Sequence, residues 1–511
     1  MVDVTLVSPW TEPVAVNPSY QLIREEIDRC MGELIPRRIG AFLEAHPANA
    51  ADYTKVVRYR TRVPFSPGLL SIAAYLEEAG YTVRLVCLDV HREMSADGPG
   101  WLKTCVDAFC KTTRIAVGVT SVTPEICRAL QVLEEVKSSA PWLRTMIGGT
   151  HVTYEDVDAA LHPAVDAVVR GEGEATALEL VSRWASGRPI ADIDGITLES
   201  EGTVVRNRDR KLLDLSALPM PAYHLLDRET ADRIHLVTMY TRGCPYKCSY
   251  CVESSFWHRL LRHKTPEKFV DEIEYVADRF DWRLIHIADS TFGLNRDATV
   301  RLCEELERRR PEVLFSINVR PDVFRYMGQD LVERLIENSF VEWCMGFESA
   351  SDELIASLER RQTYDATVDA LTRLKNLGAP FVALYTFVGA PGETHESVQR
   401  TINAVRLLLQ QELISYATTK TYIPTPGTDP FSAAEQQGIR SLSRDFRLYE
   451  RYGFPPPYLH SNLSAFEIEH YIALMQAVQL KVLRDRLGGE EEMQDRIREW
   501  ANRTYLRRIY L

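Results

Sequence analysis

The stretch CPYKCSYC, residues 244–251, places three cysteines in the spacing C-x3-C-x2-C. An apolar run at 234–240 comes shortly before it, and the two together predict a strand that leads into a loop. Three thiolates on one short loop suit a 4Fe–4S cluster, because each can hold one iron while the fourth iron stays open to another ligand. The motif therefore predicts a cluster held by Cys244, Cys248 and Cys251.

A zinc site is the alternative for the same cysteines, with His258 or His263 as the fourth ligand. Structural zinc sites more often pair C-x2-C with a second, distant pair of ligands, so we favour the cluster. The other cysteines are scattered through apolar or helical patterns, which is typical of buried thiols in a reducing compartment. They are Cys30, Cys87, Cys105, Cys110, Cys127, Cys303 and Cys344.

Strand and helix patterns alternate from the motif onward. Strands are expected at 234–240, 284–288, 314–319, 341–346, 381–388 and 416–422, and helices at 266–280, 295–309, 328–338, 364–377 and 394–411. This series predicts an open, partial (β/α)6 barrel over residues 233–430, with its chemistry at the carboxyl ends of the strands. Residues 431–511 are charged and helical in pattern, and we expect them to cap the substrate site.

The part of the chain before the motif predicts a second α/β unit, a doubly wound, Rossmann-like domain over residues 1–190. Its five strands are expected at 2–7, 83–88, 115–120, 145–148 and 166–169, with helices at 17–35, 67–80, 97–111, 124–139, 153–162 and 174–186. Part of the irregular segment 8–66 is expected to cover a site. Residues 191–232 are expected to form a linker, with a hairpin at 196–206 and a proline-containing stretch at 215–223.

Small and polar residues follow three strands of the first domain, at one edge of the predicted sheet. They are Thr120, Ser121, Thr123, Gly148, Gly149, Gly171 and Gly173. Because ligands of doubly wound sheets bind outside the carboxyl ends of the strands, this edge suits a large planar cofactor with a nucleotide tail. Glycine allows the backbone to approach such a ligand closely, although it also serves tight turns.

Composition narrows the class of protein. The 511 residues include 60 basic and 72 acidic side chains, a formal charge of −12, which argues against nucleic-acid binding. No stretch approaches the roughly 20 apolar residues that a membrane helix needs. The start, MVDVTLVSPW, reads as a strand without a basic and apolar signal region, so we expect a cytoplasmic protein.

The cysteine motif resembles the radical S-adenosylmethionine (SAM) superfamily, including the aromatic Tyr250 before the third cysteine. The resemblance continues through IADSTFGLN (287–295), SINVRPD (316–322), MGFESASDELI (345–355), FVGAPGET (387–394) and YIPTPGTDPF (422–431). It implies that SAM binds the open iron and is cleaved to a 5′-deoxyadenosyl radical, while the protein positions and shields that radical. It also implies an external electron donor such as flavodoxin or ferredoxin.

The resemblance implies roles for residues at the ends of the barrel strands. Backbone around Tyr250 would touch the adenine, and Glu348 and Ser349 would contact the ribose or the methionyl group. The remaining candidates for cofactor contacts are Asp289, Arg320, Gly389 and Pro391. For Asp289 and Arg320, a role in bridging strands remains an equal alternative.

The first domain resembles the cobalamin-binding domain of one large radical SAM subfamily. The matching segments are PFSPGLLSIAAYLEEAGYTV (64–83), VTSVTPEI (119–126), IGGTHVT (147–153), VVRGEGEATALEL (168–180) and DLSALPMPAYHLLD (214–227). His151 and Glu172 join the cofactor candidates on this basis, His151 as a contact to the nucleotide tail. The D-x-H-x-x-G signature of histidine ligation to cobalt is absent, since Asp89 and His91 lack the glycine, so a relic domain stays an alternative.

The subfamily resemblance implies a cobalamin-dependent C-methyltransferase of natural-product biosynthesis that acts on a small molecule. The leading alternative is a dehydratase, cyclase or other radical rearrangement enzyme, for example of a sugar or aminoglycoside, without methyl transfer. A cofactor-binding sensor is a third class, but it would need an output domain, and residues 431–511 show no helix-turn-helix pattern or basic surface.

Overall fold

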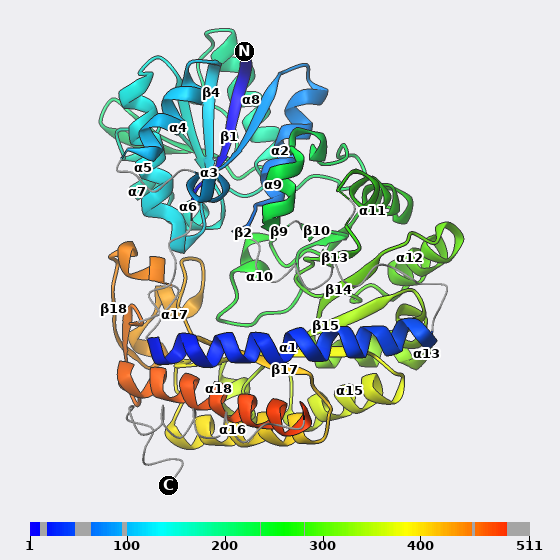
Figure 1. Ribbon diagram of the computed structural model, residues 1–511. Coiled ribbons are helices and arrows are strands. Elements are labelled where there is room, and N and C mark those ends of the chain that lie inside the picture. The colour runs from blue at the N-terminus through cyan, green and yellow to red at the C-terminus, as the bar shows by residue number, and fades with distance from the viewer. Residues whose placement is uncertain are drawn as a thin grey trace.

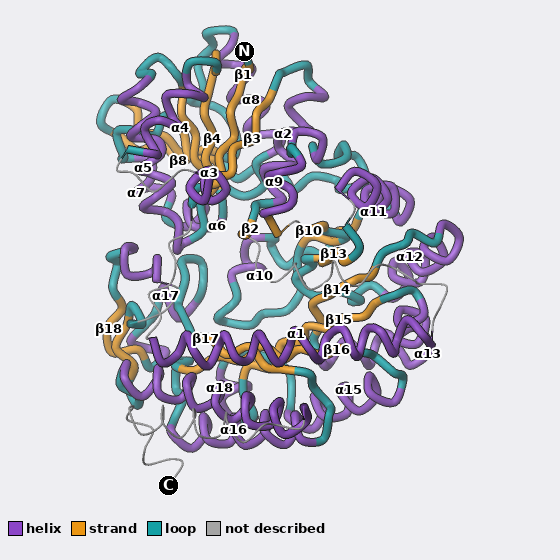
Figure 2. The backbone as a smooth tube through the Cα atoms, viewed as in Figure 1, coloured by secondary structure: helices purple, strands orange, loops and turns teal. Residues whose placement is uncertain are grey.

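The computed structural model describes residues 1–10, 18–45, 63–94, 100–235, 237–280, 282–451 and 455–487. Its two large sheets lie one beyond the other, the first near the amino terminus and the second in the middle of the chain (Figure 1). Helices cover both sheets, and loops fill the space where the sheets approach each other (Figure 2). Among the described helices, none is both long and apolar enough to cross a bilayer.

The first sheet has the strand order β3-β1-β4-β5-β6-β7-β8. Five strands are parallel: β1 (Val2–Ser8), β3 (Val83–Cys87), β4 (Thr113–Thr120), β5 (Arg144–Gly148) and β6 (Ala167–Val169). Its helices are α2 (Pro67–Glu78), α3 (Leu88–Met94), α4 (Trp101–Cys110), α5 (Ile126–Ser139), α6 (Thr150–Tyr154), α7 (Asp156–Ala160) and α8 (Glu174–Ala185). The predicted five-stranded, doubly wound core is confirmed, and its switch point lies between β1 and β4, where the strand order reverses.

The hairpin expected within the linker belongs to this sheet. β7 (Ile196–Ser200) pairs antiparallel with β6, and β8 (Thr203–Arg206) pairs with β7. Ile196 and Leu198 are buried, so the hairpin adds apolar surface to the core and covers an edge strand that would otherwise expose unpaired backbone groups.

The second sheet is the predicted partial barrel, with the order β10-β13-β14-β15-β16-β17 and every neighbouring pair parallel. The strands are β10 (Val237–Thr238), β13 (Leu284–Ile287), β14 (Leu314–Val319), β15 (Phe340–Glu348), β16 (Phe381–Val388) and β17 (Tyr416–Thr421). The helices between them are α11 (Pro266–Phe280), α12 (Arg296–Arg309), α13 (Phe324–Glu337), α15 (Tyr364–Asn376) and α16 (His395–Gln410). Strands β13 to β16 read as largely apolar runs because helices bury one face and the barrel interior the other, whereas β17 has the polar sequence YATTKT.

Helix α1 (Pro18–Ala45) follows a strand of the first sheet but packs beside the second. It lies along α18 (Ala465–Leu487) at the open, β17 side of the barrel (Figure 1). Ile23, Ile27 and Phe42 are buried there, and Glu26 pairs with Arg484 of α18 at 2.8 Å. The expected helix at 17–35 is therefore longer than predicted, and the other parts of the 8–66 segment, 11–17 and 46–62, lie outside the described residues.

The carboxyl-terminal region is less uniformly helical than expected. β18 (Ile439–Leu442) and β19 (Tyr458–His460) form an antiparallel pair, and the 3-10 turn η8 (Phe446–Arg451) packs on η4 (Thr123–Glu125) of the first domain. Ile439 and Tyr458 are buried, which fixes the pair against the barrel. Helix α18 confirms the helical part, and residues 488–511 lie outside the described chain.

Shorter elements complete the structure. They are β2 (Val63–Pro64), β9 (Ile234–His235), β11 (Thr241–Arg242), β12 (Arg262–His263), α9 (Arg228–Arg233), α10 (Val252–Phe256), α14 (Asp352–Ser357), α17 (Asp429–Ser432), η5 (Tyr223–Leu225), η6 (Pro321–Val323) and η7 (Glu435–Gln437).

Candidate active site

The cysteine loop is closed at its base by a short two-stranded ribbon. β11 and β12 pair antiparallel, with Arg242 opposite Arg262, so the loop between them leaves and returns at one place. Gly243 has φ +103°, and a Cβ there would lie 1.8 Å from the carbonyl oxygen of Leu260. Only glycine fits this close approach, which explains the Arg-Gly pair that introduces the motif.

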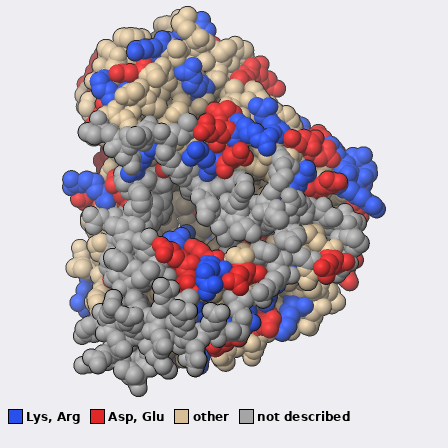
Figure 3. Space-filling model, in the orientation of Figure 1, with Lys and Arg blue, Asp and Glu red and all other residues tan. Residues whose placement is uncertain are grey.

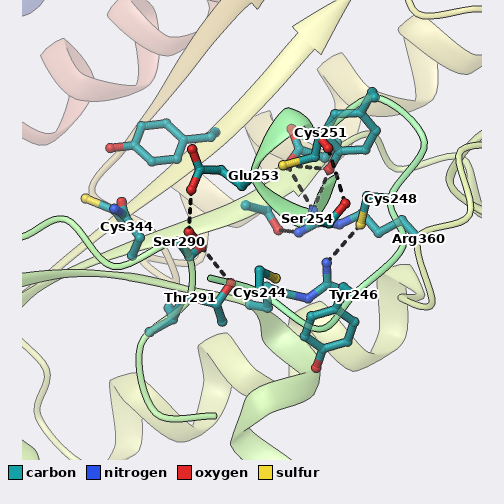
Figure 4. Close-up of a pocket in the computed structure, with 17 residues that line it drawn as sticks. Cys244, Tyr246, Cys248, Cys251, Glu253, Ser254, Ser290, Thr291, Cys344 and Arg360 are labelled. Carbon is teal, nitrogen blue, oxygen red and sulfur yellow. Dashed lines mark hydrogen bonds and ion pairs between the residues drawn. The ribbon is translucent and has the colours of Figure 1, made fainter. Parts of the chain in front are cut away.

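The three cysteines line one cavity of about 210 Å³ at the carboxyl ends of the barrel strands (Figure 4). The lining residues are Cys244, Tyr246, Cys248, Tyr250, Cys251, Glu253, Ser254, Ser290, Thr291, Asn318, Val319, Arg320, Cys344, Gly346, Glu348, Arg360 and Tyr385. The cysteine loop, β14, β15 and β16 therefore all contribute to the same space.

The three thiols line one cavity from a single loop, which suits a cubane because its irons take separate thiolates spaced around it. Among the described residues, no group of three His, Cys, Asp or Glu side chains is placed to hold a single metal ion. No histidine appears among the residues that line the cavity, so neither His258 nor His263 takes the place of a fourth zinc ligand there.

Burial favours the protonated form of two of the three thiols before metal binds. It raises the pKa of Cys244, and it raises the pKa of Cys251 to about 12, where the nearby Glu253 carboxylate adds to the effect. Iron binding must therefore displace the protons. Arg320 supplies a positive charge beside the loop, since its Nη1 donates to Cys248 Sγ at 3.2 Å.

Arg320 is itself held in place. Its guanidinium lies 3.7 Å from the centre of the Tyr246 ring, and its Nε donates to Asp322 at 2.9 Å. This strand-end arginine, which the sequence proposes for cofactor contact, therefore lines the cavity next to a candidate iron ligand.

Glu348, Tyr250 and Arg360 form a polar cluster at the cavity wall. Tyr250 Oη donates to Glu348 Oε1 at 3.2 Å, and Arg360 Nη1 lies 3.2 Å from the same oxygen. Arg360 Nη1 also donates to Tyr250 Oη at 2.6 Å, and its Nη2 donates to the Gly346 carbonyl at 2.6 Å. Burial raises the pKa of Glu348, while the charge of Arg360 opposes the shift. Glu348 Oε2 receives no hydrogen bond from the described residues, which leaves an acceptor for a ligand.

Four other barrel candidates do not line the cavity. Asp289 is fully buried and accepts hydrogen bonds from the backbone N–H groups of Tyr240 and Thr241, both at 2.9 Å, so it anchors the entry to the cysteine loop. Burial raises the pKa of Asp289 to about 7. Ser349 Oγ lies 2.9 Å from Thr401 Oγ1, away from the cavity lining.

Gly389 and Pro391 belong to a loop that other side chains hold from outside the cavity. Gly389 has φ +96°, its carbonyl accepts a hydrogen bond from Tyr458 Oη at 2.7 Å, and its N–H donates to Glu393. The carboxyl-terminal region thus contacts the loop that carries two of the expected cofactor contacts, Gly389 and Pro391. The cofactor roles of Asp289, Ser349, Gly389 and Pro391 stay predictions.

Several residues that line the cavity are not among the site residues that the sequence predicts. Glu253 Oε2 accepts a hydrogen bond from Ser290 Oγ at 2.7 Å (Figure 4). The same oxygen accepts a hydrogen bond from Trp257 Nε1 at 2.9 Å. Asn318 and Cys344 lie on neighbouring strands in matched register, and both line the cavity. Strand alternation is the available signal, since Asn318 stands two residues before Arg320 and faces the same side of the sheet.

The glycines at the edge of the first sheet occupy their positions for different structural reasons. Gly149 has φ +112°, and a Cβ there would lie 2.2 Å from the Ser121 carbonyl oxygen, so it lets two loops touch. Ser121 N donates to the Gly148 carbonyl at 2.8 Å. Gly173 packs against Ile72. Gly171 has φ +68°, and a Cβ there would meet no heavy atom within 4 Å, so this position borders open space.

The polar residues of this edge contact one another and the carboxyl-terminal region. His151 Nδ1 lies 3.2 Å from Thr123 Oγ1, and the His151 ring meets Phe446 edge-on at 4.5 Å between centroids. Burial lowers the pKa of His151 to about 4, so its imidazole is neutral at physiological pH. Thr120 ends β4 and is half-buried.

Glu172 joins the first domain to the cysteine loop. It accepts hydrogen bonds from Arg242 Nη1 at 2.7 Å, from Arg262 Nη1 and Nη2 at 3.0 Å, and from the Leu213 N–H at 2.8 Å. Glu174 accepts from Arg242 Nη2 at 2.8 Å. We call these four charged residues (Glu172, Glu174, Arg242 and Arg262) the interdomain clamp.

The ligand-facing edges of the two domains lie against each other. Tyr154 of α6 donates to Ser255 Oγ of α10 at 2.8 Å, so the edge that carries Gly149 meets the cysteine loop. In Figure 1, α6 lies at the end of the first domain that is nearer the second sheet, and α10 lies between the two sheets. The open position at Gly171 and the strand switch point suit a bulky planar ligand there.

Two family models match the chain. The model described as the radical SAM superfamily matches residues 238–405, which hold the cysteine loop and most of the barrel. The model described as the B12 binding domain matches residues 54–181, which hold most of the first domain.

Three relatives illustrate the range of named activities. An uncharacterized methyltransferase of Pyrococcus horikoshii is 28% identical over 61% of this chain and 67% of its own length. An anaerobic magnesium-protoporphyrin IX monomethyl ester cyclase of Rubrivivax gelatinosus is 29% identical over 76% of this chain and 68% of its own length. The cobalamin-dependent radical SAM methyltransferase TokK of Streptomyces tokunonensis is 32% identical over 64% of this chain and 50% of its own length.

Among solved structures, the radical SAM methyltransferase TsrM of Kitasatospora setae, with cobalamin and a [4Fe-4S] cluster bound, matches with a TM-score of 0.66. The sequences are 18% identical, and the match covers 93% of this chain and 88% of TsrM. At this identity the match establishes a shared fold across both domains.

The fold and the cysteine loop define a radical SAM enzyme. The chain belongs to the radical SAM enzymes that carry an amino-terminal B12-binding domain, and the cofactors of that class are a 4Fe–4S cluster, SAM and cobalamin. The recognition of this class from the sequence is thereby confirmed.

Replacing Glu348 by alanine should weaken SAM binding without lowering the iron content. The contact expected between Glu348 and SAM would be charge-assisted and buried, and such contacts contribute about 1–3 kcal/mol, roughly 5- to 150-fold in affinity. Equilibrium dialysis of SAM against the reconstituted protein measures the effect. Glu353→Ala is the matched control, because the carboxylate of Glu353 makes an exposed ion pair with Arg400 and does not line the cavity. Equal affinities for wild type and Glu348→Ala would move Glu348 to a packing role.

Proposed function

We propose that this protein is a cobalamin-dependent radical SAM C-methyltransferase that modifies a small molecule in natural-product biosynthesis. The observation that carries the proposal is the meeting of the two ligand-facing edges, made by the Tyr154–Ser255 contact and the interdomain clamp. Such an arrangement brings a radical source and a methyl donor to one space. TokK and TsrM, which are named as methyltransferases, support the same assignment.

When bound, the cluster and SAM supply a 5′-deoxyadenosyl radical, and cobalamin supplies a methyl group. The residues of the chain bind, orient and shield. Cys244, Cys248 and Cys251 would hold the cluster, with Arg320 donating to the Cys248 sulfur. Glu348, fixed by Arg360 and Tyr250, would accept a hydrogen bond from SAM. The barrel wall keeps bulk water away from the reacting carbon.

A radical cyclase or rearrangement enzyme is the second candidate, and the magnesium-protoporphyrin cyclase relative favours it. In that case the substrate would lose or shift bonds without gaining a methyl group. Either reaction needs single electrons, which we expect an external flavodoxin or ferredoxin to supply.

The deciding experiment uses anaerobically purified protein reconstituted with iron, sulfide and cobalamin. SAM with a deuterated methyl group is supplied together with candidate substrates, and products are analysed by mass spectrometry. Transfer of the label to carbon supports the methyltransferase. Turnover of substrate with 5′-deoxyadenosine but without label would establish the alternative.

A bulky residue at position 171 should expel cobalamin while the radical domain stays folded. Gly171 borders open space at the proposed corrin site, so Gly171→Trp would fill the volume of the ligand. Gly187→Trp is a matched control: Gly187 also has a positive φ, +65°, and open surroundings, but it lies in the turn after α8. Cobalamin content by visible absorbance should fall only in Gly171→Trp. Equal content in both variants would remove Gly171 from the cobalamin site.

A further inference from the structure

Lys420 of β17 lies on the inner face of the barrel at its mouth. In the parallel register Tyr385 is opposite Thr418, and Phe387 is opposite Lys420. Tyr385 lines the cavity, and residues two apart on a strand share a face, so Lys420 extends the cavity wall toward the carboxyl ends of the strands. Phe387 confirms the placement, because its ring centre is 5.5 Å from that of Tyr250, next to Cys251.

Lys420 has no hydrogen bond or ion pair with any residue that the structure describes. Its side chain is solvent-accessible although protein surrounds it, as in a concave site. Burial lowers its pKa, and the neighbouring charge of Arg24 lowers it further. The opposite face of the strand is different: Thr419 is buried and lies 2.7 Å from Thr386 Oγ1.

Arg24 of α1 provides the second cation. It is exposed and makes no ion pair with the described residues, whereas Arg29 and Arg38 of the same helix are neutralised. Arg29 pairs with Glu26 at 2.5 Å, and Arg38 pairs with Glu412 at 3.2 Å. Figure 3 shows a recess in this face of the molecule, with basic atoms on its lower edge and acidic atoms below.

Two unneutralised cations at one concave place repel each other and lose hydration, and a bound anion relieves both costs. The protein has a formal charge of −12, so acidic partners are available for most of its basic groups. A neighbouring lysine and arginine without such partners are therefore unusual in this chain. Lysine binds carboxylate and phosphate as a point charge, without the planar geometry that arginine requires.

We propose that Lys420, assisted by Arg24, binds an anionic group of the substrate, a carboxylate or a phosphate, at the mouth of the barrel. This assignment rests on the proposed function, because it takes the bound anion to be part of the substrate. The same chemistry has a second source, the phosphate of the cobalamin nucleotide, and the experiment separates the two.

The test uses the full chain reconstituted with cluster, cobalamin and SAM, with inorganic phosphate as the probe at constant ionic strength. Phosphate affinity is measured from the shift of the unfolding midpoint across a phosphate titration. We expect Lys420→Met to weaken phosphate binding by about 10-fold or more, as for loss of a charged partner, and Arg24→Gln to weaken it less. Arg29→Gln is the matched control from the same helix, and its phosphate affinity should equal that of the wild type.

A second measurement compares cobalamin with cobinamide, which lacks the nucleotide phosphate. We expect Lys420→Met to bind both as tightly as the wild type does. A loss of cobalamin affinity that cobinamide does not share would assign Lys420 to the cofactor phosphate and overturn the proposal. Equal phosphate affinity in wild type and Lys420→Met would overturn it as well. Neither result depends on methyl transfer. Failure of this proposal is therefore distinguishable from failure of the proposed methyltransferase function, which the deuterium experiment tests.

Discussion

Replacing Cys244, Cys248 and Cys251 by alanine is expected to abolish both the broad visible absorbance of the iron–sulfur cluster and the formation of 5′-deoxyadenosine. Among the described residues, Cys344 is the one other cysteine that lines the cavity, and a single thiolate cannot hold three irons. Without the cluster no electron reaches SAM, so the loss should be complete within detection. Anaerobic reconstitution, iron analysis and chromatography of the nucleoside product measure it.

The control for this prediction is the pair Cys105→Ala and Cys110→Ala. Both cysteines lie on α4 of the first domain, and burial raises the pKa of Cys110 to about 12, as expected for an inert thiol. Cluster absorbance and SAM cleavage should survive in this double variant. Reductive cleavage of SAM by the triple variant would contradict the assignment of the cluster ligands.

The strands and their order of appearance could be predicted because buried parallel strands are short apolar runs. Phe381–Val388 and Leu314–Val319 have the predicted bounds. The packing of α1 could not be predicted, because an amphipathic pattern gives the buried face of a helix and not the sheet that covers it. The antiparallel pair β18–β19 escapes prediction for a similar reason, since short edge strands carry little periodic signal.

The cysteines could be identified because their spacing is local, but the rest of the site is assembled over long separations. Arg360 reads as part of an exposed Glu-Arg-Arg run, yet it is buried against Tyr250, 110 residues away. The sequence suggests Glu172 as a cofactor residue, whereas its carboxylate is occupied by guanidinium groups 70 and 90 residues away. No pattern within a short window reports such contacts, and the cofactor role of Glu172 stays untested.

The interdomain clamp holds the base of the cysteine loop from the side of the first domain. The side chains of Glu172 and Glu174 are 4% and 3% exposed, and that of Arg242 is 11% exposed. Burial alone would raise the pKa of Glu172, but the hydrogen bonds from Arg262 and the charge of Arg242 outweigh it and hold the pKa below the usual range. The buried carboxylates of the clamp therefore stay charged because the arginines are beside them. Asp289 anchors the same loop from the barrel side.

Replacing Arg242 by methionine should lower the free energy of unfolding by about 3–5 kcal/mol, because it leaves a buried carboxylate without its cation. Glu174 would retain only the hydroxyl of Ser71, which donates to it at 2.7 Å. Since Arg242 stands two residues before Cys244, we expect the loop to loosen and the iron content per chain to fall. The unfolding midpoint and iron analysis of the reconstituted protein measure the two effects.

Adding Glu174→Gln to Arg242→Met should restore much of the lost stability and iron content, because the double variant no longer contains an unpaired buried charge at position 174. A general packing defect at position 242 would instead persist or worsen in the double variant. Glu353→Gln provides the contrast: its ion pair with Arg400 is exposed, and breaking such a pair costs only about 0.2–1 kcal/mol. If Arg242→Met and Glu353→Gln shift stability equally and both retain iron, the clamp does not hold the cysteine loop. A selective loss of iron in Arg242→Met, reversed by Glu174→Gln, would instead make the first domain a structural support of the cluster in addition to a cobalamin carrier.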